Sequence, residues 1–112
     1  MKELYTKEDA ERFIKGEFDA EAITYLIDEA LPSQQDCDFR HVLSCLKSMV
    51  AQLFGFYPAG DFGQAVLRND LFDAVGRADD KNILCLNLYT KFLYNKVPAS
   101  LLQEARRSLE YI

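Results

Sequence analysis

The spacing of apolar and polar residues predicts a chain made of successive helices. The first helix is expected to begin at Thr6, because its hydroxyl and the carboxylate of Asp9 can satisfy free backbone amides of a first turn. Gly16 is expected to end it. A second helix is predicted from Asp19, as its capping residue, to just before Pro32.

A long third helix is predicted between a capping pattern at Ser33 to Asp36 and Phe54, with Gly55 as its left-handed C-terminal residue. One stripe of this helix is apolar and is expected to face the core: Phe39, Val42, Leu43, Leu46, Met49, Val50, Leu53 and Phe54. The other side carries small or weakly polar residues: Cys37, His41, Ser44, Cys45, Ser48 and Ala51. Because a solvated face is normally charged, we expect this helix to be covered on both sides.

The segment 61–78 keeps helical phase behind a cap at Asp61 to Gln64, and Asn69-Asp70 leaves open whether it forms one helix or two. Asp79-Asp80 then starts a helix that extends to Lys96. Its segment 82–96 is apolar in almost every direction except for a strip formed by Asn87, Lys91 and Asn95. Such a helix is expected near the centre of the fold.

The segment 82–96 also has a strand-like alternation, which we consider as an alternative. A strand needs a partner, and no other segment offers a comparable alternation, so the helix is favoured. A last amphipathic helix is predicted after Pro98, with an apolar face of Leu101, Leu102, Ala105, Leu109 and Ile112. The predicted fold is therefore all-α: a single domain, residues 1–112, in which five or six helices surround helices 34–54 and 81–96.

The composition is that of a globular protein, with 49% hydrophobic and 28% charged residues. The longest uncharged stretch, residues 48–60, is shorter than the roughly 20 apolar residues that span a bilayer, and the N-terminus lacks the apolar core of a secretory signal. These features predict a cytoplasmic protein that does not enter membranes.

The formal charge is -5, and the acidity is concentrated in residues 1–38, which hold eleven acids and four bases. This balance disfavours nucleic acid as a partner. The favoured interpretation of the acidic segment is a solvated face that keeps a small protein soluble, and the alternative is a surface that speeds encounter with a basic protein. A helix-turn-helix placed on residues 71–88 fits poorly, because Phe72 takes a position where crossing helices need a small side chain. A DNA-binding regulator is therefore the third hypothesis for function.

The three cysteines, Cys37, Cys45 and Cys85, form no C-x-x-C pattern and are expected as reduced thiols. On the predicted third helix, Cys37, His41 and Cys45 recur at i, i+4 and i+8, where their side chains would form a ridge. Three ligands on one helix do not close a tetrahedron, so this set is a weak metal candidate. A thiol- or metal-dependent activity centred on these residues is the alternative hypothesis for function. The sequence contains no glycine-rich nucleotide-binding motif, and no cofactor is expected.

Two groups of residues are candidate contact surfaces. Phe54, Phe56, Tyr57 and Phe62 surround a turn where polar residues are usual. The favoured interpretation is that the turn folds back over the end of the bundle, and the alternative is a pocket or an anchor for a partner. The strip Asn87, Lys91 and Asn95 is favoured as the one solvated edge of a buried helix, and the alternative is that it presents amides and an ammonium to another chain. With no catalytic constellation in the sequence, we hypothesise a small acidic protein-binding module without catalysis, such as an inhibitor, an immunity-type protein, a secretion chaperone or an adaptor. A homodimer through the small-residue helix face is also considered.

Overall fold

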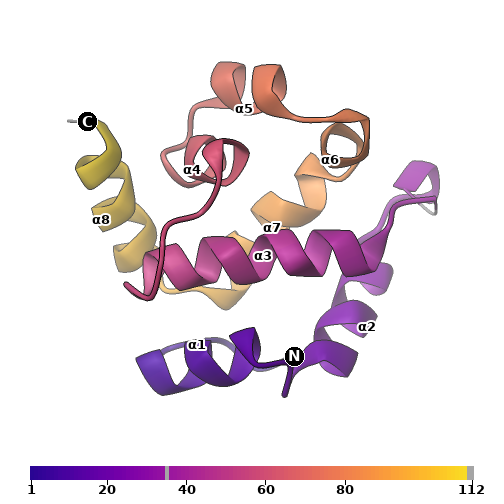
Figure 1. The fold of residues 1–112 in the computed structure, drawn as a ribbon. Helices are drawn as coiled ribbons and strands as arrows, with labels where there is room; N and C mark the ends of the chain where they lie inside the picture. The colour runs from indigo at the N-terminus through magenta and orange to yellow at the C-terminus, as the bar shows by residue number, and fades with distance from the viewer. Residues whose placement is uncertain (35, 111–112) are drawn as a thin grey trace.

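The computed structural model describes residues 1–34 and 36–110, and the side chains of residues 80, 81 and 108–110 are outside that description. Within these ranges the chain forms eight α-helices, one short 3-10 helix and no strand (Figure 1). Their bounds are α1 (Lys7–Ile14), α2 (Asp19–Glu29), η1 (Pro32–Gln34), α3 (Phe39–Leu53), α4 (Asp61–Leu67), α5 (Leu71–Arg77), α6 (Asp80–Leu84), α7 (Leu86–Lys96) and α8 (Ala99–Glu110). The all-α prediction is confirmed.

The start of α1 follows the sequence prediction, because the Thr6 hydroxyl accepts a hydrogen bond from the Asp9 amide. Gly16, at φ 98°, follows the end of this helix. The predicted cap at Asp19 is wrong: Phe18 holds the cap position, and no side chain caps α2. The Asp19 carboxylate instead pairs with the Lys47 ammonium of α3 at 2.8 Å.

The long central helix starts later than predicted. Pro32–Gln34 forms η1 instead of a capping turn, and α3 begins after Asp38, whose carboxylate accepts from the His41 amide at 3.2 Å. The reason is tertiary, because the Gln34 side chain is buried and bonded to residues of the α6–α7 region. Cys37 therefore precedes the helix, and the predicted ridge of Cys37, His41 and Cys45 does not form.

The segments 61–78 and 80–96 each form two helices, a possibility that the sequence left open for the first segment and did not predict for the second. Asn69, at φ 62°, and the cap at Asp70 separate α4 from α5, which settles the question left open by the sequence. Cys85 leaves helical geometry between α6 and α7, and Asp79 caps α6 by accepting from the Asn82 amide at 2.7 Å. Because both halves of residues 80–96 are helical, the strand alternative is wrong.

Helix α3 is covered on both sides, as its two faces predicted. It contacts α1 and α2 on one side and α4, α7 and α8 on the other (Figure 1). The predicted stripe lies in the core or packs partly against it, and the small Ala51 on the opposite side is also fully buried. Among the other large buried side chains are Phe13 of α1 and Phe92 of α7, whose ring centroids lie 5.3 Å apart.

Residues 1–4 are attached to the end of α7. The Leu4 amide donates to the Lys96 carbonyl at 2.7 Å, and the Lys96 ammonium donates to the Met1 carbonyl at 2.8 Å. Leu4 itself is fully buried. Helix α8 follows this junction and packs against α3 and α4; the predicted contacts of Leu109 and Ile112 lie outside the described residues.

No helix in residues 1–34 and 36–110 combines the length and the apolar character that crossing a bilayer requires.

Candidate functional site

A groove of about 720 Å³ lies between the α3–α4 connection and α8. Figure 1 shows this connection passing beside α8 as it rises to α4. We call it the aromatic groove and define it by its lining residues: Gln52, Leu53, Phe54, Gly55, Phe56, Tyr57, Pro58, Gln64, Leu101, Glu104 and Ala105. Its volume falls in the range of protein sites that accept a ligand or several partner side chains.

The turn after α3 forms one wall of the groove. Gly55, at φ 83°, is in the left-handed conformation that reverses the chain at a helix end. Its amide donates to the Gln52 carbonyl at 3.1 Å, and the next amide, of Phe56, donates to the Ala51 carbonyl at 2.8 Å. These two bonds form a Schellman motif, which directs Phe56 and Tyr57 away from the helix axis.

The four aromatic residues predicted as a contact surface separate into two pairs. Phe54 is 6% exposed and belongs to the core, and the Phe62 ring packs edge-on to the buried Tyr89 at 5.5 Å. Phe56 and Tyr57 remain 40% and 48% exposed. Only the second pair is therefore available to another molecule.

Two glutamines fix the far end of the connection. The Ala59 amide donates to Oε1 of Gln52, and Nε2 of Gln64 donates to the Ala59 carbonyl, both at 2.8 Å. Because a backbone amide only donates and a carbonyl only accepts, these bonds define which atom of each side chain is oxygen and which is nitrogen. Both glutamines line the aromatic groove.

Among the residues whose side chains the structure describes, the lining contains one charged residue, Glu104 on α8. At the edge of the groove the Lys7 ammonium lies 5.8 Å from the centroid of the Phe56 ring, within the range of a cation–π contact. Sequence reasoning missed Glu104 and both glutamines, because their place in a common wall depends on how α8 packs against the end of α3.

The predicted strip on α7 is engaged within the chain. Asn87 donates to Gln34 at 3.2 Å, the Lys91 ammonium lies 3.5 Å from the Glu29 carboxylate, and Asn95 donates to the Tyr25 hydroxyl at 3.2 Å. Burial raises the pKa of that Tyr25 phenol. The strip thus connects α7 to α2 and η1.

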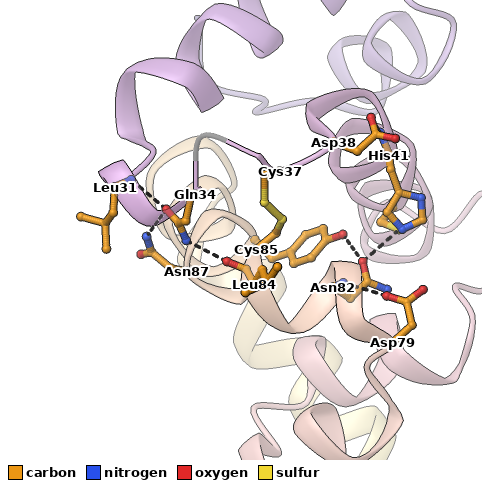
Figure 2. Close-up of a disulfide and its surroundings, with 12 residues drawn as sticks. Leu31, Gln34, Cys37, Asp38, His41, Asp79, Asn82, Leu84, Cys85 and Asn87 are labelled. Atoms are coloured by element: carbon orange, nitrogen blue, oxygen red, sulfur yellow. Dashed lines mark hydrogen bonds between the residues drawn. A yellow bond between two sulfur atoms is a disulfide. The ribbon is translucent and has the colours of Figure 1, made fainter.

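A disulfide joins Cys37, ahead of α3, to Cys85 at the α6–α7 corner (Figure 2). The expectation that all cysteines are thiols is therefore wrong for this pair. The two Cα atoms are 6.5 Å apart, within the span that a disulfide accepts. Spacing along the sequence did not reveal the pair, because its members are 48 residues apart and meet only when the chain folds.

Cys45 is the remaining cysteine and is partly buried. Its sulfur lies 3.7 Å from Nε2 of His41 and 4.0 Å from Oδ1 of Asn82, which also accepts from the Tyr89 hydroxyl at 2.6 Å. Burial raises the pKa of the Tyr89 phenol. Because Cys37 is in a disulfide, only two of the three residues considered as metal ligands, His41 and Cys45, lie together. The described part of the chain contains no cluster of three metal-ligating side chains.

Comparisons with profiles of protein families, with curated proteins and with solved structures find no match for this chain.

Proposed function

We propose that this chain is a small protein-binding module without catalysis and that the aromatic groove is its contact surface. The observation that carries the proposal is the exposure of Phe56 and Tyr57 beside an apolar wall of α8. Aromatic side chains next to a hollow are the usual anchors of protein interfaces. The acidic N-terminal third would speed encounter with a basic partner.

The test is to fill the groove. Ala105 is a small lining residue on α8, so Ala105→Trp is expected to occupy the space that a partner side chain would use. The matched control is Gln103→Trp, an exposed substitution on the same helix that leaves the lining unchanged. Circular dichroism and thermal unfolding establish that both variants fold.

The three proteins are then used as bait in a lysate of the cells that produce the chain. The proposal requires a protein that is retained by the wild type and by Gln103→Trp and is lost with Ala105→Trp. Equal retention by all three baits would contradict the role of the groove. Native mass spectrometry of the same proteins identifies a second copy as the occupant if Ala105→Trp alone converts a dimer to a monomer.

We place the protein in the cytoplasm on the sequence grounds given above. Because disulfides are rare in that compartment, the Cys37–Cys85 pair tests the location. Rapid alkylation of thiols in intact cells is expected to label all three cysteines in the cytoplasm. Labelling of Cys45 alone would indicate an oxidising compartment and contradict this location.

A second candidate function, thiol chemistry at Cys45, is favoured by the 3.7 Å approach of the His41 imidazole. An imidazole nitrogen at this position can accept the thiol proton and leave a nucleophilic thiolate. The test is the rate of alkylation by iodoacetamide at neutral pH, which should fall in His41→Gln. An unchanged rate would remove this candidate.

A further inference from the structure

We propose that α5 forms the interface of a homodimer, in which Phe72 of each copy packs over Gly76 of the other. This surface is separate from the aromatic groove, whose lining among the described residues includes none from α5, so the inference goes beyond the proposed function. It is carried by an exposed apolar face, by a projecting ring and an open position one helical turn apart on that face, and by the pairing of the charges beside it.

The outward face of α5 is apolar. Leu71, Phe72 and Val75 are 68%, 93% and 40% exposed, and Gly76 is exposed beside them. Because successive residues of a helix are separated by about 100°, these four positions form one face about 140° wide. Ala74, which is 2% exposed, lies on the opposite side, and α5 packs on α4 at the edge of the molecule (Figure 1). A continuous apolar face that points away from the core is typical of a contact surface.

Phe72 and Gly76 make this face complementary to itself. Phe72 is its most exposed side chain, and no described atom beyond the neighbouring backbone lies within 4 Å of the position that a Cβ would take at Gly76. A two-fold axis between these two residues places Phe72 of each copy over Gly76 of the other, with the two helices antiparallel. The absence of a side chain at Gly76 lets the helices approach closely, and both rings leave water together. A second copy therefore supplies the matching surface.

The charges beside the apolar face are paired within the chain. The Asp73 carboxylate pairs with the guanidinium groups of Arg68 and Arg77. Arg77 also lies 3.4 Å from the Asp61 carboxylate. Arg68 lies 3.6 Å from that of Asp70. These two arginines and three aspartates leave one net negative charge, although the whole chain carries -5. Two copies can therefore meet at α5 with little repulsion between like charges.

The size of the face indicates a weak dimer. Each copy contributes one helix of seven residues, so the buried surface falls below the roughly 1,200 Å² at which interfaces of standard size begin. Contacts of this size belong to transient complexes. The dimer is therefore expected to form as the protein concentration rises and to dissociate on dilution.

The test is the mass of the protein in solution, measured by sedimentation equilibrium from about 10 µM to about 1 mM. The wild type is expected to change from monomer to dimer over this range. Phe72→Ser, at a position that the core does not use, is expected to raise the dissociation constant about tenfold, because each dimer loses two aromatic anchors. The matched control is Tyr94→Ser on α7, which removes a ring that is 84% exposed and is expected to leave the dissociation constant unchanged.

Gly76→Leu separates the interface from folding. Leucine forms helices better than glycine, and the position is open, so the free energy of unfolding of the dilute protein is expected to rise. The same side chain occupies the place of the Phe72 ring of the other copy, so the dissociation constant is expected to rise about tenfold. Ala105→Trp, which fills the aromatic groove, is expected to leave the dimer unchanged.

A wild type that stays monomeric at about 1 mM would overturn the proposal, and so would a dimer that Phe72→Ser leaves intact. A dimer that Gly76→Leu tightens would show that Phe72 does not pack over this position and would overturn it as well. A dimer lost only in Ala105→Trp would place the second copy in the aromatic groove instead of on α5. Binding of another protein in that groove is tested separately by the lysate experiment, so the two proposals can fail independently.

Discussion

Gln34 joins three stretches of chain through a single buried amide. Its oxygen accepts from the Leu31 backbone and from the Asn87 side chain, and its nitrogen donates to the Leu84 carbonyl (Figure 2). A buried polar group is stable only when it is paired in this way. Asn82 has a similar role on the other side of the disulfide, where it accepts from Tyr89. These residues fix the geometry of the corner that apolar packing alone would leave less defined.

Asp9 makes the stability of the N-terminal segment depend on pH. The Lys2 ammonium, 2.8 Å away, is the main cause of a lowered pKa for Asp9, about 2 against an ordinary 3.8, and the Tyr5 amide adds to it. Because the folded-state pKa is the lower one, ionised Asp9 stabilises the fold above pH 3.8, and this contribution is lost as the pH falls through about 2.

We therefore expect the free energy of unfolding of Asp9→Asn to lie below that of the wild type at neutral pH, with a gap that closes as the pH falls through this window. Urea unfolding over a pH series measures the gap. Glu8→Gln, which removes a charge from the same turn and keeps the pair with Lys2, serves as the control. A gap that stays constant down to pH 2 would show that the carboxylate of Asp9 is not responsible.

A glycine stabilises this fold where the backbone has a positive φ and destabilises it inside a helix, and Gly55 and Gly76 represent these two cases. Gly55 is at φ 83°, where a side chain is strained, so Gly55→Ala is expected to lower the free energy of unfolding by about 1–2 kcal/mol. Gly76 lies inside α5 with open space around it, so Gly76→Ala is expected to raise the same quantity by about 0.5–1 kcal/mol. Chemical denaturation of both variants gives the two values, and effects of the same sign would contradict this explanation.

The element-scale predictions from sequence succeeded where the signal is local. The cap at Thr6 and the left-handed Gly55 each depend on a few neighbouring residues, and both are as predicted. Ser33 offered an equally good local signal and failed, because burying Gln34 against the α6–α7 corner outweighs one capping bond. The aromatic groove needs α8 to pack against the end of α3, a contact between distant segments that no local pattern specifies.

At the scale of the molecule, the disulfide closes a loop across 48 positions of sequence. Closing a loop of this length restricts the unfolded chain and contributes about 4 kcal/mol in the chain-entropy description. The double variant Cys37→Ser, Cys85→Ser is therefore expected to unfold at a clearly lower denaturant concentration than the oxidised wild type. Cys45→Ser, which keeps the disulfide, is the matched control and is expected to change stability by less. Equal midpoints for the double variant and the oxidised protein would show that the bond does not support the fold.

Hydrogen bonds between residues 1–4 and Lys96 hold the start of the described chain against the end of α7, and α8 lies outside these contacts. These bonds form between segments that both precede α8, so α8 can detach from the fold without breaking them. We expect its amides to exchange with deuterium faster than those of α7, as a separate cooperative unit. One wall of the aromatic groove would then belong to residues 1–97 and the other to α8, which detaches separately. A molecule bound in the groove would therefore slow exchange in α8 more than anywhere else.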